Sequence, residues 1–342
     1  MQIRSTDYIP TGRAGPVGEE GGESPPVISS LPSRLLLRAS RSDRLRRWAG
    51  RSSLLRRAVR RYLPGEDLSD ALDAAERLSE NDIEAIVTCL GEDVETRAGA
   101  REVREHYLGV IEASREHPAD PELSVKPTHL GLDHDPDLAR EGAVALAEAS
   151  NRRGRTMWLD MESSPRVDPT LALYRELRRR GADVGVCLQA YLRRTGEDLE
   201  GLLDLEAGLD SGGGIRLVKG AYDEPAEVAF PRKDRVDDNF LRLSRRMLEA
   251  AGGGLRMAFA THDRGLQREI RSGARSLDVE PGAYEFQMLY GVEEEAQRAL
   301  AREGEAVRVL VSYGDHWFPW YMRRLAERPA NLVFMLRQAL PG

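Results

Sequence analysis

The sequence predicts an α/β protein built as a closed barrel of eight parallel strands. Two patterns lead to this fold class: eight short apolar runs rich in β-branched residues, and polar stretches with helical spacing between them. Strands that alternate with helices imply βαβ crossovers and a parallel sheet. A count of eight favours a closed (βα)8 barrel over an open doubly wound sheet. The length of 342 residues admits one such barrel or two smaller domains.

The eight predicted strands begin after residue 80 and follow one another along the chain. They are the runs 83–91, 122–131, 156–162, 183–191, 214–222, 256–263, 283–291 and 307–314. Between them, segments such as 135–154 and 168–181 start with Asp-Pro, place apolar residues three or four apart and finish with Gly behind Arg, as helices do. No glycine-rich dinucleotide fingerprint follows any of the strands.

The chain before the barrel divides into two segments. Residues 1–33 are rich in Gly, Pro, Ser and Glu and are predicted to be a disordered tail. Residues 34–62 hold eleven Arg against one acid and predict a basic amphipathic helical arm. The arm either binds an anionic surface or packs on the body with a solvated basic face, and the second interpretation is favoured. Residues 63–342 are assigned to the barrel.

Composition excludes several classes of protein. The formal charge of −7 argues against a nucleic-acid coat, and no apolar stretch approaches the ~18 residues of a membrane span. The first 30 residues contain no apolar signal region. Cys89 and Cys187 stand in apolar runs, which predicts two buried reduced thiols and neither a disulfide nor a metal site. We therefore expect a cytoplasmic protein, soluble or peripheral on a membrane.

Candidate functional residues stand where the predicted strands end, because barrels of this class build their active sites there. The 50 cations include three Lys and hence 47 Arg, and two of the Lys, Lys126 and Lys219, fall at strand ends. A buried ammonium can lose its proton near neutral pH, whereas a guanidinium cannot. The other residues at strand ends are Asp160, Met161, Glu162, Gln189, Gly220, Ala221, Tyr222, Thr261, His262, Asp263, Gln287, Leu289, Tyr290, Tyr313 and Asp315.

A second candidate set follows the eighth strand. Trp320, Arg323, Arg324 and Glu327 are spaced to share one face of a helix. Adjacent Arg side chains on such a face can clamp a carboxylate or a phosphate. A solvated Arg pair is the plain alternative in a chain this rich in Arg, and no glycine-rich phosphate loop supports a phosphate-binding barrel.

Seven ordered motifs resemble the proline dehydrogenase family, the flavoenzymes that oxidise L-proline to Δ1-pyrroline-5-carboxylate. They are SVKPTHLGL (124–132), WLDMESS (158–164), VGVCLQAYLRRTGEDLE (184–200), GIRLVKGAY (214–222), FATHD (259–263), YEFQMLYGV (284–292) and YMRRLAERPANLVF (321–334). The resemblance covers residues 62–340 and implies a distorted TIM-type barrel with N-terminal helices. It also implies FAD across the strand ends and a final helix over the barrel mouth.

The resemblance assigns roles position by position. The residues it places against FAD are Asp160, Met161, Gln189, Arg216, Val218, Lys219, Gly220, Ala221, Thr261, His262 and Glu327. Those it places at the proline site are Lys126, Tyr222, Leu289, Arg323 and Arg324. Plain structural alternatives remain, since Met161, Val218 and Leu289 could be core residues and His262 a structural histidine.

The catalytic roles implied are those of Lys126, Asp160 and Arg216. The Arg323–Arg324 pair would bind the substrate carboxylate, Lys126 and Asp160 would organise loss of the ring-nitrogen proton, and Arg216 would stabilise the reduced flavin. The group that finally takes the proton stays open. The family also implies a quinone acceptor, peripheral membrane contact through the arm, and a separate pyrroline-5-carboxylate dehydrogenase downstream, with no nucleic-acid partner.

Three departures from the family pattern bear on the substrate. Trp320 and Leu310 replace Tyr, Ser312 replaces Pro, and Pro127-Thr128-His129 follow Lys126 where the family has a Leu-Ser-Ala type of sequence. Fewer hydroxyls beside the ring could admit a hydroxylated or larger cyclic imino acid. A degraded barrel that acts as a binding module is a further alternative.

Overall fold

Eight parallel strands close into a barrel in the computed structural model, which describes residues 59–91, 94–209 and 213–317. The strands are β1 (Glu84–Cys89), β2 (Glu122–Val125), β3 (Met157–Leu159), β4 (Val184–Gln189), β5 (Gly214–Val218), β6 (Arg256–Ala260), β7 (Tyr284–Leu289) and β8 (Ala306–Tyr313). Each pairs with the next along the chain, and β8 pairs with β1. The predicted (βα)8 barrel is confirmed, with one strand inside or at the edge of each predicted run.

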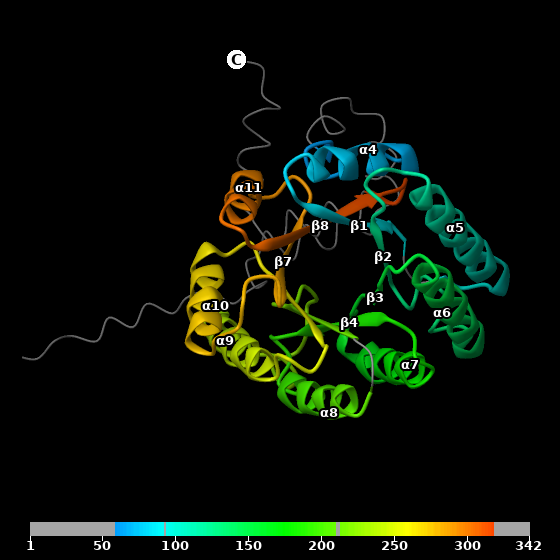
Figure 1. The fold of residues 1–342 in the computed structure, drawn as a ribbon. Coiled ribbons are helices and arrows are strands. Elements are labelled where there is room, and N and C mark those ends of the chain that lie inside the picture. The colour runs from blue at the N-terminus through cyan, green and yellow to red at the C-terminus, as the bar shows by residue number, and fades with distance from the viewer. Residues whose placement is uncertain (1–58, 92–93, 210–212, 318–342) are drawn as a thin grey trace, which may run out of the picture.

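A ring of helices surrounds the strands (Figure 1). The helices are α4 (Leu68–Ser79), α5 (Arg97–Arg115), α6 (Pro136–Asn151), α7 (Val167–Arg179), α8 (Thr195–Ala207), α9 (Lys233–Glu249), α10 (Arg264–Ser276) and α11 (Glu294–Arg302), with a 3-10 turn at Ser164–Arg166. Helix α4 precedes β1 and packs against β1 and β8. It therefore covers the seam where the barrel closes.

The predicted Asp-Pro helix start is observed at Asp135, whereas α7 begins at Val167, before Asp168, because the 3-10 turn Ser164–Arg166 runs directly into it. Asp135 precedes α6, its carboxylate accepts the Leu138 amide at 3.1 Å, and Pro136 occupies the first turn. Asp263 precedes α10 and accepts the Gly265 amide at 2.9 Å. Both carboxylates satisfy amides that have no partner within their helix. Asp263 is thus both the end of a strand motif and the cap of the next helix.

The apolar core lies between the strands and the helices. Strand residues such as Phe259 and Phe286 and helix residues such as Phe240 and Leu171 are fully buried members of one apolar cluster. Transfer of each such side chain from water stabilises the fold by ~1.5–3 kcal/mol. This outer layer holds the barrel wall in place, while the interior is left to a different set of side chains.

Trp158 fills the middle of the barrel interior. Its indole is fully buried and belongs to a small separate cluster with Ile86 and Ala258, against which Leu310 packs. Gly185 and Gly214 pair across β4 and β5, and a Cβ on either would lie 2.2 or 2.7 Å from the indole. The absence of a side chain at these two positions therefore leaves room for the indole.

Below the indole, at the strand starts, lies a set of four charged residues that we call the lower cluster: Glu122, Arg256, Glu285 and Arg308. Arg256 donates to Glu122 at 2.6 Å and to Glu285 at 2.7 Å, and Arg308 Nε donates to Glu285 at 3.2 Å. Burial alone would raise the pKa of Glu285, but the Arg308 and Arg256 guanidiniums hold it below its ordinary value. The lower cluster is a set of ion pairs at the strand starts, extended by a pair between Arg308 and Glu84, and it lies away from the strand ends that carry the predicted site.

Candidate functional site

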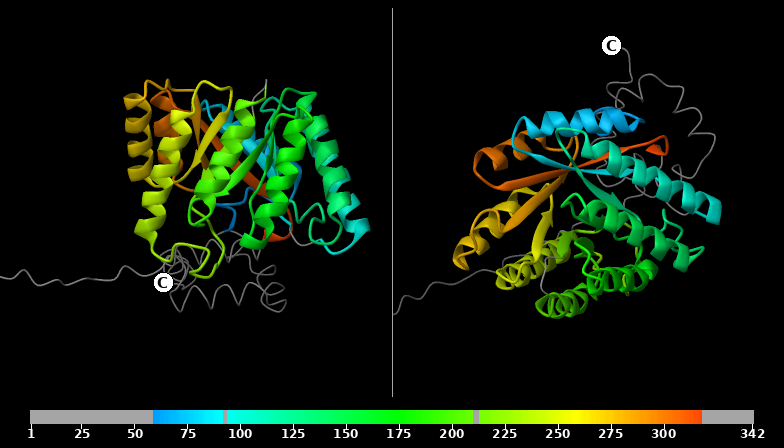
Figure 2. Two further views of the ribbon diagram at one scale, coloured as in Figure 1. Left: turned by 90° about the horizontal axis from the view of Figure 1, so that it is seen from below. Right: turned by 45° about the vertical axis from the view of Figure 1, so that its right-hand side comes forward.

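The predicted site residues that the structure describes gather at one end of the barrel. Parallel strands place all their carboxyl ends on the same side, and Figure 2 shows the strands and helices running side by side between the two ends. Lys126, Asp160, Lys219 and Thr261 directly follow β2, β3, β5 and β6, while Gln189 closes β4. The strand-end candidates on these elements are therefore neighbours in space.

Asp160 and Arg216 form a buried ion pair, which we call the upper pair. Arg216 Nη1 donates to Asp160 Oδ1 at 2.7 Å, and the Ser124 hydroxyl donates to the same oxygen at 2.8 Å. The Arg216 side chain is 5% exposed and that of Asp160 is 18% exposed. Ser124 of β2 and Asp160 at the end of β3 thus hold one nitrogen of the guanidinium, whereas Arg216 itself lies on β5.

Two nitrogen atoms of the Arg216 guanidinium make no hydrogen bond to the described residues. They are Nε and Nη2, and both are buried. A buried donor without a partner costs ~1–3 kcal/mol or more for a charged group. A buried guanidinium that remains incomplete at the active end of a barrel fits a site whose bound group completes it.

Lys219 meets two carboxylates at the end of β5. Its Nζ lies 2.5 Å from Asp237 Oδ1 and 3.3 Å from Asp263 Oδ2. Partial burial would raise the pKa of Asp263, but the Lys219 ammonium and the amides of the α10 start lower it. Asp237 and Asp263 therefore hold Lys219 between α9 and α10.

The chain turns sharply after Lys219. Gly220 has φ +113°, and a Cβ there would lie 2.2 Å from the ring of Tyr191. An L side chain is excluded by both the backbone and the space. The turn lets the long β5–α9 loop pass beside Tyr191 and places Tyr222, which is half-buried, near the strand ends.

The same loop is fastened to the neighbouring β3–α7 connection. Glu224 accepts the Ser164 amide and the Ser164 hydroxyl, both at 2.6 Å. Loop segments without strand partners need such anchors to hold a defined position. Sequence reasoning did not single out Glu224, and its contact spans 60 residues, which no local pattern reveals.

Gln189 and His262 are tied to backbone groups of adjacent strand ends, and the backbone of Thr261 is tied to the helix that follows it. Gln189 Nε2 donates to the Glu162 carbonyl at 2.8 Å, and the Thr261 carbonyl accepts Gln267 Nε2 at 2.9 Å. His262 Nε2 accepts the Leu289 amide at 3.3 Å, so a neutral ring carries its proton on Nδ1. Met161 is buried and Val218 and Ala221 are half-buried at the same end of the barrel.

Lys126 follows β2 at a turn that a neighbouring strand end stabilises. Glu162 accepts the Thr128 amide at 3.0 Å and the Thr128 hydroxyl at 2.6 Å. The Pro127-Thr128-His129 sequence, which departs from the family pattern, thus has a defined partner in Glu162. Lys126 itself is half-buried.

Four predicted site residues lie outside the described residues: Trp320, Arg323, Arg324 and Glu327. The predicted helix over the barrel mouth, the tail 1–33 and most of the arm 34–62 also lie outside them. At the described end of the arm, Val59 is buried and Arg60 and Arg61 are exposed. This short stretch packs on the body through its apolar residue.

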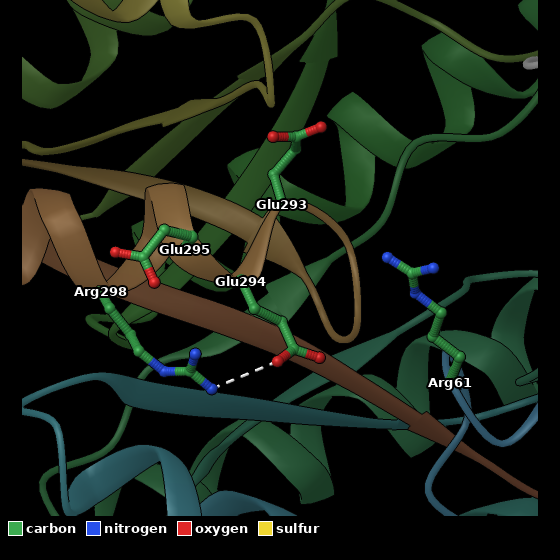
Figure 3. A pocket seen from close by; sticks show the side chains of 5 residues that line it. All are labelled: Arg61, Glu293, Glu294, Glu295 and Arg298. Carbon is green, nitrogen blue, oxygen red and sulfur yellow. Dashed lines mark hydrogen bonds and ion pairs between the residues drawn. The ribbon is translucent and has the colours of Figure 1, made fainter.

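A pocket of about 500 Å³ opens where this stretch crosses the β7–α11 turn. Figure 3 shows its lining residues, which are Arg61, Glu293, Glu294, Glu295 and Arg298. Glu294 and Arg298 pair across one turn of α11 at 3.2 Å, and both are exposed. None of the predicted site residues lines this pocket, so it is separate from the strand-end site.

Comparison with known proteins identifies the family of this chain. A family profile described as Proline dehydrogenase matches residues 71–337. The chain belongs to the proline dehydrogenase family. It is 36% identical over 285 residues to Proline dehydrogenase 1 of Bacillus subtilis subsp. natto, covering 83% of this chain and 91% of that protein. It is also 36% identical over 287 residues to Proline dehydrogenase of Deinococcus radiodurans, covering 82% and 90%.

Solved structures agree on the fold. The barrel matches proline utilization A from Bdellovibrio bacteriovorus, inactivated by N-propargylglycine, with a TM-score of 0.74 and 23% identity over 79% of this chain. It matches a second structure, proline utilization A with proline bound in remote sites, with a TM-score of 0.68 and 23% identity over 82% of this chain. In both cases the chain spans 32% of the longer protein's length. The resemblance read from the motifs is therefore confirmed at the level of family and fold.

Three further residues near the strand ends escaped sequence reasoning: Ser124, Trp158 and Glu162 in its role as an anchor. Ser124 and Trp158 each stand two positions before a predicted site residue, and alternate strand residues face the same side. That period-two signal could have identified both. The partner of Glu162 depends on a contact across 34 residues, for which the sequence holds no comparable signal.

Proposed function

We propose that this chain oxidises L-proline to Δ1-pyrroline-5-carboxylate, the first step of proline degradation, with FAD as the hydride acceptor. Membership of the proline dehydrogenase family supports the reaction, as do relatives of that name that align over most of the chain. The observation that carries the proposal is the upper pair. It presents a permanent positive charge with unused donors at the end of the barrel where the motifs gather.

The described residues fit a flavin at Arg216, which offers Nε and Nη2 from a buried position. The residues that we propose to hold FAD are Asp160, Met161, Gln189, Arg216, Val218, Lys219, Gly220, Ala221, Thr261, His262 and Glu327. When bound, FAD supplies the two-electron chemistry that no side chain provides.

Arg216 has the clearest task in this proposal. A guanidinium stays charged at every physiological pH, and a cation beside a flavin stabilises the negative charge that reduction places there. Asp160 and Ser124 keep that charge in one position without reorganisation during the reaction. Asp160 therefore has two roles in this proposal. It holds Arg216 in place, and it acts with Lys126 on the proton of the ring nitrogen.

Lys126 and Asp160 organise the loss of the proton from the ring nitrogen, so that its lone pair can assist the departure of hydride. Tyr222 and Leu289 shape the space around the ring. Arg323 and Arg324 bind the substrate carboxylate as a bidentate clamp, which turns an encounter into an oriented step. These roles rest on the motif assignments together with the placement of the described members at one end of the barrel.

The experiment is a flavin spectrum of the purified protein before and after anaerobic addition of L-proline. The proposal predicts a bound flavin whose absorption bleaches with L-proline. A protein that takes up no added FAD, or whose flavin stays oxidised, contradicts it. Comparing kcat/KM for L-proline and trans-4-hydroxy-L-proline on the same protein decides whether a protein with these departures, at Trp320, at Leu310 and Ser312 and after Lys126, accepts a wider range of substrates.

Electrons then pass to a membrane quinone, and the basic segment 34–62 attaches the protein to the inner face of the membrane. No helix among the described residues is long and apolar enough to cross a bilayer, and eleven Arg supply the attraction to anionic lipid. Binding to anionic liposomes that weakens as the salt concentration rises supports this membrane attachment. Equal binding after deletion of residues 34–58 contradicts it. A separate pyrroline-5-carboxylate dehydrogenase takes the product.

A further inference from the structure

Arg216 rests on the face of a tryptophan. Its guanidinium carbon lies 4.6 Å from the centroid of the Trp158 ring. Arg256 of the lower cluster lies over the same ring at 5.2 Å. A guanidinium held against an indole gains ~0.5–2 kcal/mol from the interaction with the ring. The indole is therefore in contact with both the upper pair and the lower cluster.

The indole itself cannot shift. Trp158 is fully buried, and its Nε1 donates to Glu122 Oε2 at 2.8 Å. Gly185 and Gly214 approach the ring so closely that a Cβ would overlap it. A ring that is hydrogen-bonded at its edge and enclosed by backbone provides a rigid surface for Arg216.

The hydrogen bonds of Arg216 do not prevent a rotation of its guanidinium. Asp160 and Ser124 both contact Nη1, at 2.7 and 3.3 Å, so the described hydrogen bonds hold the guanidinium at a single nitrogen. Rotation about that point would carry Nε and Nη2 away from the strand ends. The carboxylates of Glu122 and Glu285 lie in the interior below and would attract a guanidinium that moved toward them.

We propose that Trp158 is a positioning residue for the flavin chemistry. Its indole face blocks the descent of Arg216 toward the lower cluster and keeps Nε and Nη2 available to the flavin. This inference rests on the proposed function, because it assigns those two donors to FAD. Trp158 acts through Arg216 and needs no contact of its own with substrate or cofactor.

The test is the two-electron midpoint potential of the bound flavin in Trp158→Met, Arg216→Met and the double variant. Met is smaller than Trp, but it is apolar and flexible enough to fill irregular core space, and it offers no planar face. In Trp158→Met the equilibrium constant for reduction falls at least tenfold, about 30 mV for a two-electron couple. In the Arg216→Met background the same replacement has no effect, because the residue through which Trp158 acts is already gone.

Phe259→Leu is the matched control. It removes a fully buried aromatic ring from the same barrel, but from the outer face of β6, and it leaves the potential unchanged. An unchanged potential in Trp158→Met, or an equal shift with and without Arg216, overturns the inference.

Where Trp158→Met does not fold, Trp158→Phe carries the test, because Phe lacks the Nε1 bond to Glu122 and its ring is free to tilt. A smaller shift in the same direction that vanishes with Arg216→Met supports the inference, and no shift overturns it.

Failure of this inference is distinguishable from failure of the proposed function. A wild-type protein that binds no FAD, or whose flavin L-proline does not reduce, removes the proposed function. A wild-type protein that behaves as proposed, with Trp158 variants of normal potential, removes the role of Trp158 alone.

Discussion

The two ends of the barrel interior use charge in different ways. In the lower cluster each Arg and each Glu finds an oppositely charged partner, with Arg256 bridging Glu122 and Glu285 and Arg308 adding to Glu285. In the upper pair Arg216 meets one carboxylate and retains two donors without a described partner. Trp158 lies between these sets and contacts both.

We propose that this difference separates charges that hold the fold from charges that serve chemistry. Buried ions are tolerated when partners satisfy them, and removal of one partner strongly destabilises the fold. An incomplete set is kept only where a bound group completes it or where charge develops during the reaction. Changes in the lower cluster should therefore affect stability, and changes in the upper pair should affect turnover.

The largest expected effect is on stability. Glu285→Ala leaves Arg256 and Arg308 without a shared carboxylate and lowers the free energy of unfolding by about 3–5 kcal/mol, measured by urea denaturation. Glu294→Ala breaks an exposed pair on α11 and costs less than about 1 kcal/mol. Equal losses in the two variants would contradict the assigned difference between buried and exposed pairs.

Asp160→Asn should act on turnover. The neutral amide holds Arg216 more weakly, and loss of a charge-assisted hydrogen bond of ~1.5–3 kcal/mol lowers kcat about 10- to 100-fold. Stability should change far less than in Glu285→Ala. Asp168→Asn removes an exposed pair with Arg194 and serves as the control with unchanged kcat. A normal kcat in Asp160→Asn would place the chemistry elsewhere.

Acid should weaken the lower cluster. The pKa of Glu285 is lower in the folded protein than its ordinary value of 4.5, despite burial, because of Arg308 and Arg256. Its contribution to stability is therefore complete above about pH 4.5 and is lost as the pH falls from there through the folded-state pKa. The free energy of unfolding of Glu285→Gln should fall less over that range. An identical acid dependence in the two proteins would show that other carboxylates dominate.

The smallest expected effect concerns the two thiols. Burial raises the pKa of Cys187 to about 12 and that of Cys89 to about 11. Because the thiolate is the reactive form, both should react with a disulfide reagent at pH 8 far more slowly than in the denatured protein. Rapid labelling of Cys187 in the native protein would show that water reaches the space around the upper pair.

The sequence revealed the fold well because its signals are local. β-branched runs, Asp-Pro starts and Gly stops each operate within a few residues. The predicted runs begin within one residue of the observed strands, but the run 122–131 extends six residues beyond the end of β2. The strand-end rule then brought Lys126, Asp160, Gln189, Lys219 and Thr261 to one end of the barrel. The motif resemblance selected Arg216, which stands inside a strand and not at its end.

The interior of the barrel could not be predicted in the same way. Arg256 and Glu122 are 134 residues apart, and Arg308 and Glu285 are on different strands. In a chain with 47 Arg, no composition signal distinguishes these guanidiniums from exposed ones. The strand register decides which of them meet. The strand period places Trp158 on the same side as Asp160, but nothing in the sequence shows that its indole contacts Arg216 and Arg256.

The central claim is that the upper pair carries the chemistry while the lower cluster carries the fold. The rate of flavin reduction by L-proline, followed anaerobically in a single turnover, tests it most directly in Arg216→Met at equal FAD occupancy. We predict a rate about 10²- to 10³-fold below that of the wild type, with the free energy of unfolding reduced less than in Glu285→Ala. A wild-type rate in Arg216→Met would contradict the account.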